Sequence, residues 1–351
     1  MRKYKSLRIL GGRISVLTEK KAALTITTLF LIMGAAIVAS TGLGDVKVSP
    51  MNVLNVFFGG GSDLERLVVT EFRLPRTIVA VFVGMALAAA GAVLQGMIRN
   101  PLASPDIIGV TGGAGAAVVG FLAVFSNESN ALTVSVNWIS LAAFLGALLT
   151  ASIVYFLAYK DGISPVRLVL IGIGVSALMQ ALTTFLMIMG PIHRAAQANI
   201  WITGSVNGSN WGNVQVLVPL VTVLLLTAFI TASKLNIQEL GEQLATGLGG
   251  RVQAQRLFML VISTALVGAA VAFGGTMGFV GLMAPHMARR LVGGTYGALL
   301  PAAALIGGLL VLFADMIGRT LFLPLEVPAG VFTATIGAPY FIYLLLKTRN
   351  S

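Results

Sequence analysis

The sequence predicts an all-α integral membrane protein, and three observations lead to this fold class. Of the 351 residues, 57% are hydrophobic and only 10% are charged, whereas ordinary soluble domains carry about 25% charged residues. Apolar stretches of about 20 residues, the length that an α-helix needs to cross the hydrocarbon core, recur from Ala22 almost to the C-terminus. They lack the alternation of barrel strands, so we expect a helical bundle.

The chain begins with a basic segment, residues 1–21, which we expect to lie in the cytoplasm. Its seven cations are Arg2, Lys3, Lys5, Arg8, Arg13, Lys20 and Lys21. The apolar stretch that follows is too long for a signal-peptide core and has no clear cleavage site, which indicates an uncleaved first helix. Residues 22–351 then form one polytopic membrane domain.

About ten transmembrane helices are predicted, and the eighth is short and contains Pro285 and His286. Their ranges are 22–43, 75–97, 105–126, 137–159, 165–189, 213–233, 254–275, 278–293, 298–322 and 328–347. With both termini in the cytoplasm, these crossings place 17 of the 23 Lys and Arg residues inside and 6 outside. The positive-inside rule therefore explains the formal charge of +11 better than nucleic-acid binding does.

Small residues indicate how the helices pack. Gly84, Ala88, Ala92 and Gly96 share one helix face, and Gly112, Ala116 and Gly120 share a face of the next helix. Such stripes let two backbones approach closely in lipid. The similarity of residues 84–91 to residues 268–275 also suggests an inverted repeat.

Two polar segments interrupt the apolar pattern. The outer segment, residues 44–76, ends in Arg73-Leu-Pro-Arg76. The inner segment, residues 236–250, spaces Leu240, Leu244 and Leu248 four apart among polar residues, and it predicts one amphipathic helix that ends at Gly249 and Gly250.

Several collinear motifs resemble the permeases of the FecCD family, which import ferric siderophores, haem and cobalamin. They are Arg73-Leu-Pro-Arg76, Gln95 to Pro105 with Gly109, Trp201 to Ser205 before Trp211, the segment LGEQLATGLG, Gly278 to Leu282 with Pro285, His286 and Arg289, Asp315 with Arg319, and Glu326 to Gly330 leading to Pro339. They run in family order from about residue 73 to residue 345. The basic N-terminal extension is not part of the family pattern.

The resemblance implies the permease fold of a type II ABC importer, located in the bacterial cytoplasmic membrane. It implies a second permease subunit, identical or paralogous, with two cytoplasmic ATPases beneath and an extracytoplasmic substrate-binding protein above. ATP and Mg would be used by the partner ATPase, and no cofactor or metal would bind directly to this chain, which is then not an enzyme. No nucleic acid is expected as a partner.

The resemblance also assigns roles to the inner segment and to the loop after the second helix. The ATPase coupling residues would be Leu240, Gly241, Leu244, Ala245, Gly247, Leu248 and Gly249. Alternatively, the leucines lie on the membrane surface. Asn100 and Leu102 would form a cytoplasmic gate, or Asn100 with Pro101 would only shape the turn.

At the outer helix ends, the resemblance makes Arg73, Arg76 and Arg319 docking residues for acidic groups on the binding protein. The alternatives are snorkelling towards the lipid headgroups and, for Arg319, an ion pair with Asp315 four residues earlier. His286 is expected to satisfy a backbone carbonyl freed by Pro285 and is assigned no ligand role.

Other functional classes fit the sequence less well. An ion-coupled secondary transporter usually needs acidic residues in mid-membrane, and most of the predicted helices contain none. A membrane enzyme would need a constellation such as HExxH, which is absent, and no GxxxxGK[ST] loop for ATP hydrolysis is present either. We expect a ferric siderophore as cargo, with haem or cobalamin as alternatives.

Overall fold

The computed structural model describes residues 4–9, 14–125, 133–135, 137–160, 162–189 and 192–349, and nearly all of them are helical. The α-helices are α1 (Lys20–Gly42), α2 (Pro50–Phe57), α3 (Asp63–Arg66), α4 (Leu74–Ile98), α5 (Val110–Phe125), α6 (Asn137–Ala158), α7 (Pro165–Met189), α8 (Ile192–Thr203), α9 (Trp211–Ile230), α10 (Ala232–Glu239), α11 (Glu242–Gly247), α12 (Val252–Gly274), α13 (Val280–Val292), α14 (Tyr296–Thr320) and α15 (Ala329–Arg349). A π-helix, η1 (Leu67–Arg73), precedes α4, and a 3-10 helix, η2 (Pro105–Ile108), precedes α5. The predicted all-α class is confirmed.

Each of the ten predicted segments coincides with a helix, namely α1, α4, α5, α6, α7, α9, α12, α13, α14 and α15. Within the described ranges, eight helical segments are long and apolar enough to cross a membrane. The other two, α5 and α13, have only 16 and 13 residues. At about 1.5 Å per residue, these two are shorter than a hydrocarbon core of about 30 Å.

The outer segment is more ordered than the sequence suggested. Helical structure runs without interruption from Asp63 to Ile98, so the predicted start of the second helix at residue 75 is wrong. A capping box starts this helix, because the side chain of Ser62 accepts from the N–H of Glu65, and the Glu65 carboxylate accepts in return from the N–H of Ser62. The two strands of the basic N-terminal segment, β1 (Tyr4–Ile9) and β2 (Ile14–Glu19), form an antiparallel hairpin that the sequence analysis did not predict.

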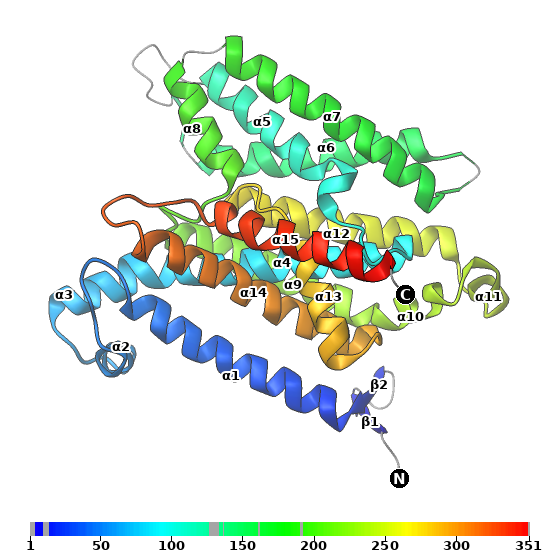
Figure 1. Cartoon of the computed structure of the whole chain (residues 1–351), viewed down its shortest axis with the longest axis horizontal. Coiled ribbons are helices and arrows are strands. Elements are labelled where there is room, and N and C mark those ends of the chain that lie inside the picture. Colours follow the sequence, from blue (N-terminus) through cyan, green and yellow to red (C-terminus); the bar gives the residue numbers. More distant parts are fainter. Residues whose placement is uncertain are drawn as a thin grey trace.

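Helix α4 is the centre of the bundle and packs against α12, α13 and α14 (Figure 1). Gly84 lies so close to the backbone of Gly307 on α14 that a Cβ would overlap its carbonyl oxygen, and Gly91 lies equally close to Gly281 on α13. Backbone contact of this kind requires small residues on both helices. The predicted packing role of the stripe on α4 is confirmed.

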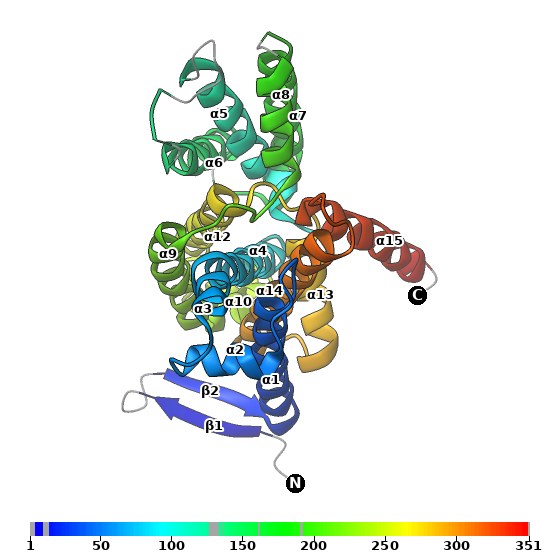
Figure 2. The ribbon, with the colours of Figure 1, turned by 90° about the vertical axis from the view of Figure 1, so that its left-hand side faces the viewer.

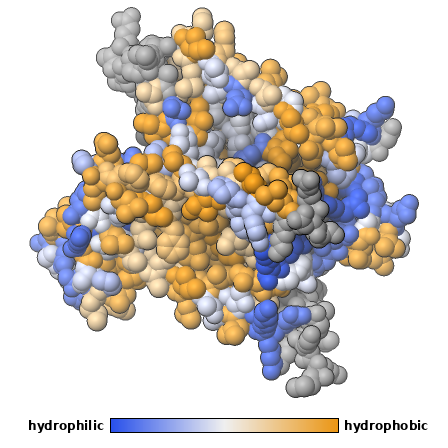
Figure 3. All heavy atoms as spheres, viewed as in Figure 1, coloured by the Kyte–Doolittle hydropathy of each residue, from blue (hydrophilic) through white to orange (hydrophobic). Residues whose placement is uncertain are grey.

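Helices α5 to α8 form a separate layer above the central helices (Figures 1 and 2). The glycines of α5 face its neighbours in this layer, with Gly112 against Met179 on α7 and Gly113 against Thr150 on α6. Hydrophobic side chains cover most of the visible face of the molecule, and hydrophilic ones gather near α3 at one end and near α10 and α11 at the other (Figure 3). An apolar belt between two polar ends suits a membrane protein. The inverted repeat stays a prediction.

Candidate functional site

Arg76 at the start of α4 joins two acidic residues from the far end of the chain. Its Nη2 and Nε atoms lie 2.8 and 3.0 Å from Oδ1 of Asp315 on α14. Its Nη1 lies 3.0 Å from Oε2 of Glu326, in the loop between α14 and α15. The Asp315 side chain is 3% exposed, whereas that of Glu326 is 38% exposed. One arginine therefore holds a buried and an exposed carboxylate at once.

The other two arginines are hydrogen-bonded to the end of α1. Arg319 donates to the carbonyl of Leu43 at 2.8 Å and to the carbonyl and hydroxyl of Ser40, and its Nε lies 3.5 Å from Asp315. Arg73 donates to the carbonyls of Thr41, Gly42 and Val46 at 3.2, 3.1 and 2.6 Å. The structure thus brings the three predicted docking residues together, but it gives each of them partners within the chain.

These internal contacts limit which of the three arginines can reach lipid headgroups or a binding protein. Arg73 and Arg319 are buried, so neither reaches lipid headgroups as a snorkelling residue would. The ion pair of Arg319 with Asp315 is present as one of the predicted alternatives. Docking stays a prediction, and Arg76 is the one of the three whose second partner, Glu326, is exposed enough to be exchanged.

The inner segment consists of two short helices, α10 and α11, instead of the single amphipathic helix that was predicted. The break lies at Leu240-Gly241, where Gly241 has φ +107°, a conformation that side-chain-bearing residues rarely adopt. Leu240, Leu244 and Leu248 are 57%, 61% and 68% exposed, and Ala245 is buried. All three leucines thus remain accessible despite the break.

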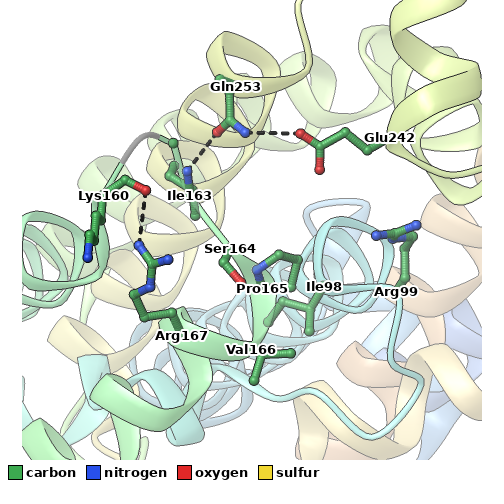
Figure 4. Close-up of a pocket in the computed structure, with 11 residues that line it drawn as sticks. Ile98, Arg99, Lys160, Ile163, Ser164, Pro165, Val166, Arg167, Glu242 and Gln253 are labelled. Atoms are coloured by element: carbon green, nitrogen blue, oxygen red, sulfur yellow. Dashed lines mark hydrogen bonds between the residues drawn. The ribbon is translucent and has the colours of Figure 1, made fainter.

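Helix α11 is anchored to α12 and to the loop before α7 (Figure 4). Arg256 on α12 contacts Glu242 at 3.0 Å and donates to the Ile163 carbonyl at 2.8 Å. Gln253 accepts from the N–H of Ile163 at 2.7 Å and donates to Glu242 at 3.3 Å. Ile163, Glu242 and Gln253 border a pocket of about 690 Å³ whose lining also includes Arg99, Lys160 and Arg167. Through Gln253 and Arg256 of α12, α11 is thus connected to the loop that leads into α7.

Helix α10 has its own anchor on the central helices. Glu239 accepts from Arg289 on α13 and from the hydroxyl of Tyr296 on α14, both at 3.2 Å. The side chain of Asn236 accepts from the N–H of Tyr296 at 2.9 Å. The inner segment is thus held at both ends by charged or polar contacts, while Leu240, Leu244 and Leu248 stay largely exposed.

The predicted gate segment forms a tight turn after α4. Arg99 has a left-handed backbone with φ 56°, and the side chain of Asn100 accepts from the N–H of Leu102 at 2.9 Å. This bond shows the turn-forming role of Asn100 that was one of the two interpretations. The gate itself stays a prediction.

A small polar cavity lies just beyond this turn. Asp106 of η2 lines it with Thr111 of α5, with Ser176, Gln180 and Thr183 of α7, and with Ile202 and Thr276, and its volume is about 250 Å³. The Asp106 carboxyl hydrogen-bonds to the side chain of Thr111.

His286 on α13 bonds to a side chain instead of a backbone carbonyl. Its Nδ1 lies 2.7 Å from the hydroxyl of Tyr340 on α15. The expectation of a carbonyl partner is therefore wrong, because α15 brings a hydroxyl within reach. The contact joins two helices and supplies no evidence of a ligand role.

The model of the FecCD transport family matches residues 30–347 of this chain. The chain belongs to the FecCD transport family. It is 59% identical to the Bacillus subtilis (strain 168) probable siderophore transport system permease protein YfhA over 333 residues, covering 95% of this chain and 97% of the relative.

A second relative and a solved structure extend this result. The chain is 44% identical to the achromobactin transport system permease protein CbrC of Dickeya dadantii (strain 3937), covering 97% of this chain and 96% of the relative. A solved inward-facing conformation of a candidate metal-chelate type ABC transporter superposes with a TM-score of 0.80 at 29% identity, covering 93% of this chain and 99% of the other. The predicted permease fold is confirmed, and this FecCD chain is a multi-pass membrane transport subunit rather than an enzyme.

Sequence reasoning missed several residues of this FecCD permease that the structure connects. Glu239, Glu242 and Arg256 belong to the polar part of the inner segment and its flank, but their partners lie on other helices. Asp106 directly follows the motif Gln95 to Pro105. An acidic residue in a predicted membrane helix is unusual and could have indicated a functional position.

Proposed function

We propose that this chain is the transmembrane permease subunit of an ATP-driven importer that moves ferric-siderophore complexes across the bacterial cytoplasmic membrane. The single observation that carries the proposal is the inner segment. It presents three exposed leucines on a surface that is anchored by ion pairs to helices α12 and α13. A segment that only rested on lipid would not need such anchors, whereas one that transmits force from an ATPase would.

The partners follow from this role. A second permease, identical or paralogous, would complete the pathway, two cytoplasmic ATPases would bind the α10–α11 surface and hydrolyse ATP with Mg, and a binding protein would deliver the chelate. Leu240, Leu244 and Leu248 would enter a groove on the ATPase, and Gly241, Ala245, Gly247 and Gly249 would shape the segment that enters. Asn100 and Leu102 would close the cytoplasmic end of the pathway between transport cycles.

Docking of the binding protein would centre on Arg76, with Arg73 and Arg319 holding that end of the bundle together. An acidic side chain that arrives from the binding protein can replace the exposed Glu326 at the Arg76 guanidinium. Exchange of one carboxylate for another keeps the arginine paired throughout, which avoids the cost of a desolvated, unpaired charge. Arg73 and Arg319 would contribute through the shape of the outer surface.

The choice of cargo rests on relatives. Besides the two already described, the Bacillus subtilis (strain 168) iron(3+)-hydroxamate import system permease protein FhuG is 40% identical over 330 residues, covering 94% of this chain and 98% of the relative. The three names refer to a siderophore, to achromobactin and to iron(3+)-hydroxamate, and none of them refers to haem or cobalamin. A ferric siderophore is therefore the cargo class that we assign.

Co-purification tests this function. The tagged chain, extracted in mild detergent, should bring down an ATPase and a second permease, and mass spectrometry of the binding protein from the same genetic neighbourhood should find an iron chelate. Cells that lack the chain should lose uptake of that chelate and regain it with the intact gene. A partner set without an ATPase, or a binding protein loaded with haem or cobalamin, would refute the assignment.

The orientation can be tested separately because the chain contains no cysteine. With both termini and the inner segment in the cytoplasm, a membrane-impermeant thiol reagent should label Phe58→Cys in intact cells but should not label Gln243→Cys. Both positions are exposed. Labelling of Gln243→Cys alone would invert the topology.

A further inference from the structure

A second large cavity, of about 510 Å³, lies between α6, α9 and α12 and shares no lining residue with the networks described above. Helices α6 and α9 each pack against α12 but scarcely touch one another. Helix α12 is thus the floor of the cavity, and α6 and α9 are its two walls. Figure 2 shows α6 in the upper layer and α9 and α12 below it, so the cavity occupies the seam between the two layers.

The floor of the cavity is made of small residues. Ala269 and Ala272 of α12 line it. Next to them, a Cβ at Gly268 would lie 3.0 Å from the ring of Phe144 on α6. The two helices are therefore in tight contact beside the cavity, while the short alanine side chains leave the space above them open. This arrangement produces an apolar slot that runs along the helices.

One end of this slot is polar. Asn210 and Asn213, at the start of α9, both line it. Each side-chain Oδ1 accepts from the backbone N–H of the other residue, at 3.0 and 3.2 Å, which caps the helix. These bonds use only the oxygens of the two amides. Among the described residues, no acceptor pairs with either Nδ2 group, so the rim of the cavity carries unused hydrogen-bond donors.

The cavity extends from this rim through about one leaflet of the bilayer. The indole N–H of Trp211 donates to the Thr70 carbonyl on η1 at 3.0 Å, so the rim lies at the end of the molecule that carries Arg76. From Asn210 to Leu220, the part of α9 that lines the cavity rises roughly 15 Å at about 1.5 Å per residue. This length is about half of a hydrocarbon core of about 30 Å.

The cavity is continuous with the apolar surface of the protein. Leu141 of α6 and Val216 of α9 line it and are also exposed. Other exposed aliphatic side chains follow along the same helices, at Leu145 and Val223. Side chains of this kind are as apolar as lipid tails and contact them in the membrane. An acyl chain can therefore enter the slot between α6 and α9 directly from the bilayer.

We propose that this cavity is a phospholipid site, in which one acyl chain lies on Ala269 and Ala272 and headgroup oxygens accept from Asn210 and Asn213. Phosphate and ester oxygens are acceptors without a proton, which suits amides whose donors are unused. The volume falls within the usual range of about 300–1,000 Å³ for ligand pockets. A helix of another subunit, about 10–12 Å across, would need at least about twice this volume over the same length. The proposal requires only a membrane location and does not depend on the cargo assigned above.

The first test maps the lipid on the full-length chain, delipidated in maltoside detergent. The probe is phosphatidylglycerol with a photoreactive diazirine in the middle of one acyl chain, and the labelled peptides are identified by mass spectrometry. Label should concentrate on residues 216–220 and 269–273. Unlabelled phosphatidylglycerol should displace it, and dioleoylglycerol, which lacks the phosphate, should compete about tenfold less well. Label that is spread evenly over exposed residues such as Leu24 and Leu170, or that no lipid displaces, would overturn the proposal.

The second test changes the rim without removing the helix cap. Asn210→Asp and Asn213→Asp keep a side-chain oxygen for each capping bond but replace the amide donor with a negative charge. Both variants should unfold at the original temperature in lipid-free detergent and bind the probe about tenfold more weakly or less. Asn55→Asp, an exposed position on α2, makes the same charge change outside the cavity and should bind normally. Unchanged probe binding in both rim variants would overturn the proposal.

A third variant keeps the proposal testable if the rim variants are unstable. Ala272→Leu adds apolar volume to the floor and leaves the rim intact. It should exclude the acyl chain, so that labelling of residues 216–220 is lost and added phosphatidylglycerol no longer raises the thermal unfolding temperature as a ligand of the folded chain does. Undiminished labelling and an undiminished rise in this variant would show that the lipid lies elsewhere.

Discussion

The guanidinium of Arg76 lies 2.8 Å from the carboxylate of Asp315, although 239 positions separate the two residues in the sequence. Arg319 approaches the same carboxylate from the other side. Asp315 is thus the acidic centre of a cluster that joins the start of α4 to the end of α14, and its charge balances two arginines that are largely removed from solvent.

Replacement of this carboxylate should therefore destabilise the bundle. Asp315→Asn keeps the shape of the side chain but leaves Arg76 and Arg319 short of a counter-charge. Removal of one partner from a buried pair costs roughly 3–5 kcal/mol. We expect a clearly lower thermal unfolding temperature in detergent. Glu71→Gln, which neutralises an exposed acidic residue on the preceding π-helix, serves as the control and should unfold like the original chain. Equal stability of the two variants would show that the cluster contributes little.

The exposed second partner of Arg76 gives a prediction in the opposite direction. If a carboxylate of the binding protein replaces Glu326 at Arg76, then Glu326→Gln removes the competing internal group. The variant should bind the loaded binding protein several-fold more tightly, and the gain should shrink at high salt because the new contact is electrostatic. Affinity is measured with the complete importer in nanodiscs.

Two further variants separate the possible explanations. Glu71→Gln should leave the affinity unchanged, and Arg76→Gln should weaken binding. Weaker binding by Glu326→Gln would mean that Glu326 itself supports the docking surface, and no effect of Arg76→Gln would remove Arg76 from it. A charge reversal at Arg73 is a poor test, because a glutamate there would face three backbone carbonyls.

The packing of α4 predicts a strong contrast between two glycines. A side chain at Gly91 would overlap the carbonyl of Gly281, whereas nothing lies within 4 Å of a Cβ built at Gly34 on α1. Gly91→Val should lower the yield of monodisperse protein in size-exclusion chromatography, since overpacking of a rigid contact typically costs about 1–3 kcal/mol or more. Gly34→Val should behave like the original chain. Normal behaviour of Gly91→Val would mean that α4 and α13 can separate without loss.

Gly247 offers a test of the coupling surface that does not disturb the chain itself. Nothing lies within 4 Å of a Cβ at this position, so Gly247→Glu should be tolerated by the permease alone. If the ATPase packs against this surface, the bulky charge should abolish chelate uptake and weaken ATPase association at normal expression. Gly247→Ala should keep most of the activity. Normal uptake by Gly247→Glu would refute the coupling role of this segment.

The membrane helices could be predicted from the sequence because a long apolar segment in lipid must satisfy its backbone hydrogen bonds internally. An α-helix does this within one segment. The packing role of the small residues from Gly84 to Gly96 could also be predicted, since small residues on one helix face let two helices approach closely in lipid. The predictions were wrong in polar segments, where the structure depends on the backbone conformation of a few residues. The helix around residues 236–250 was predicted as continuous, because its leucine spacing does not reveal that Gly241 adopts a positive φ.

The sequence by itself determined the class of the protein, the place of its apolar helices, and its family, because each depends on composition or on collinear motifs. Only the tertiary structure decided what the charged residues contact. Arg73, Arg76 and Arg319 carry the same guanidinium, yet Arg73 bonds to carbonyls, Arg76 to two carboxylates, and Arg319 to both kinds of group. In a medium that offers no water, a charged group takes the nearest partner that the folded chain brings to it, and that partner can lie hundreds of residues away in the sequence.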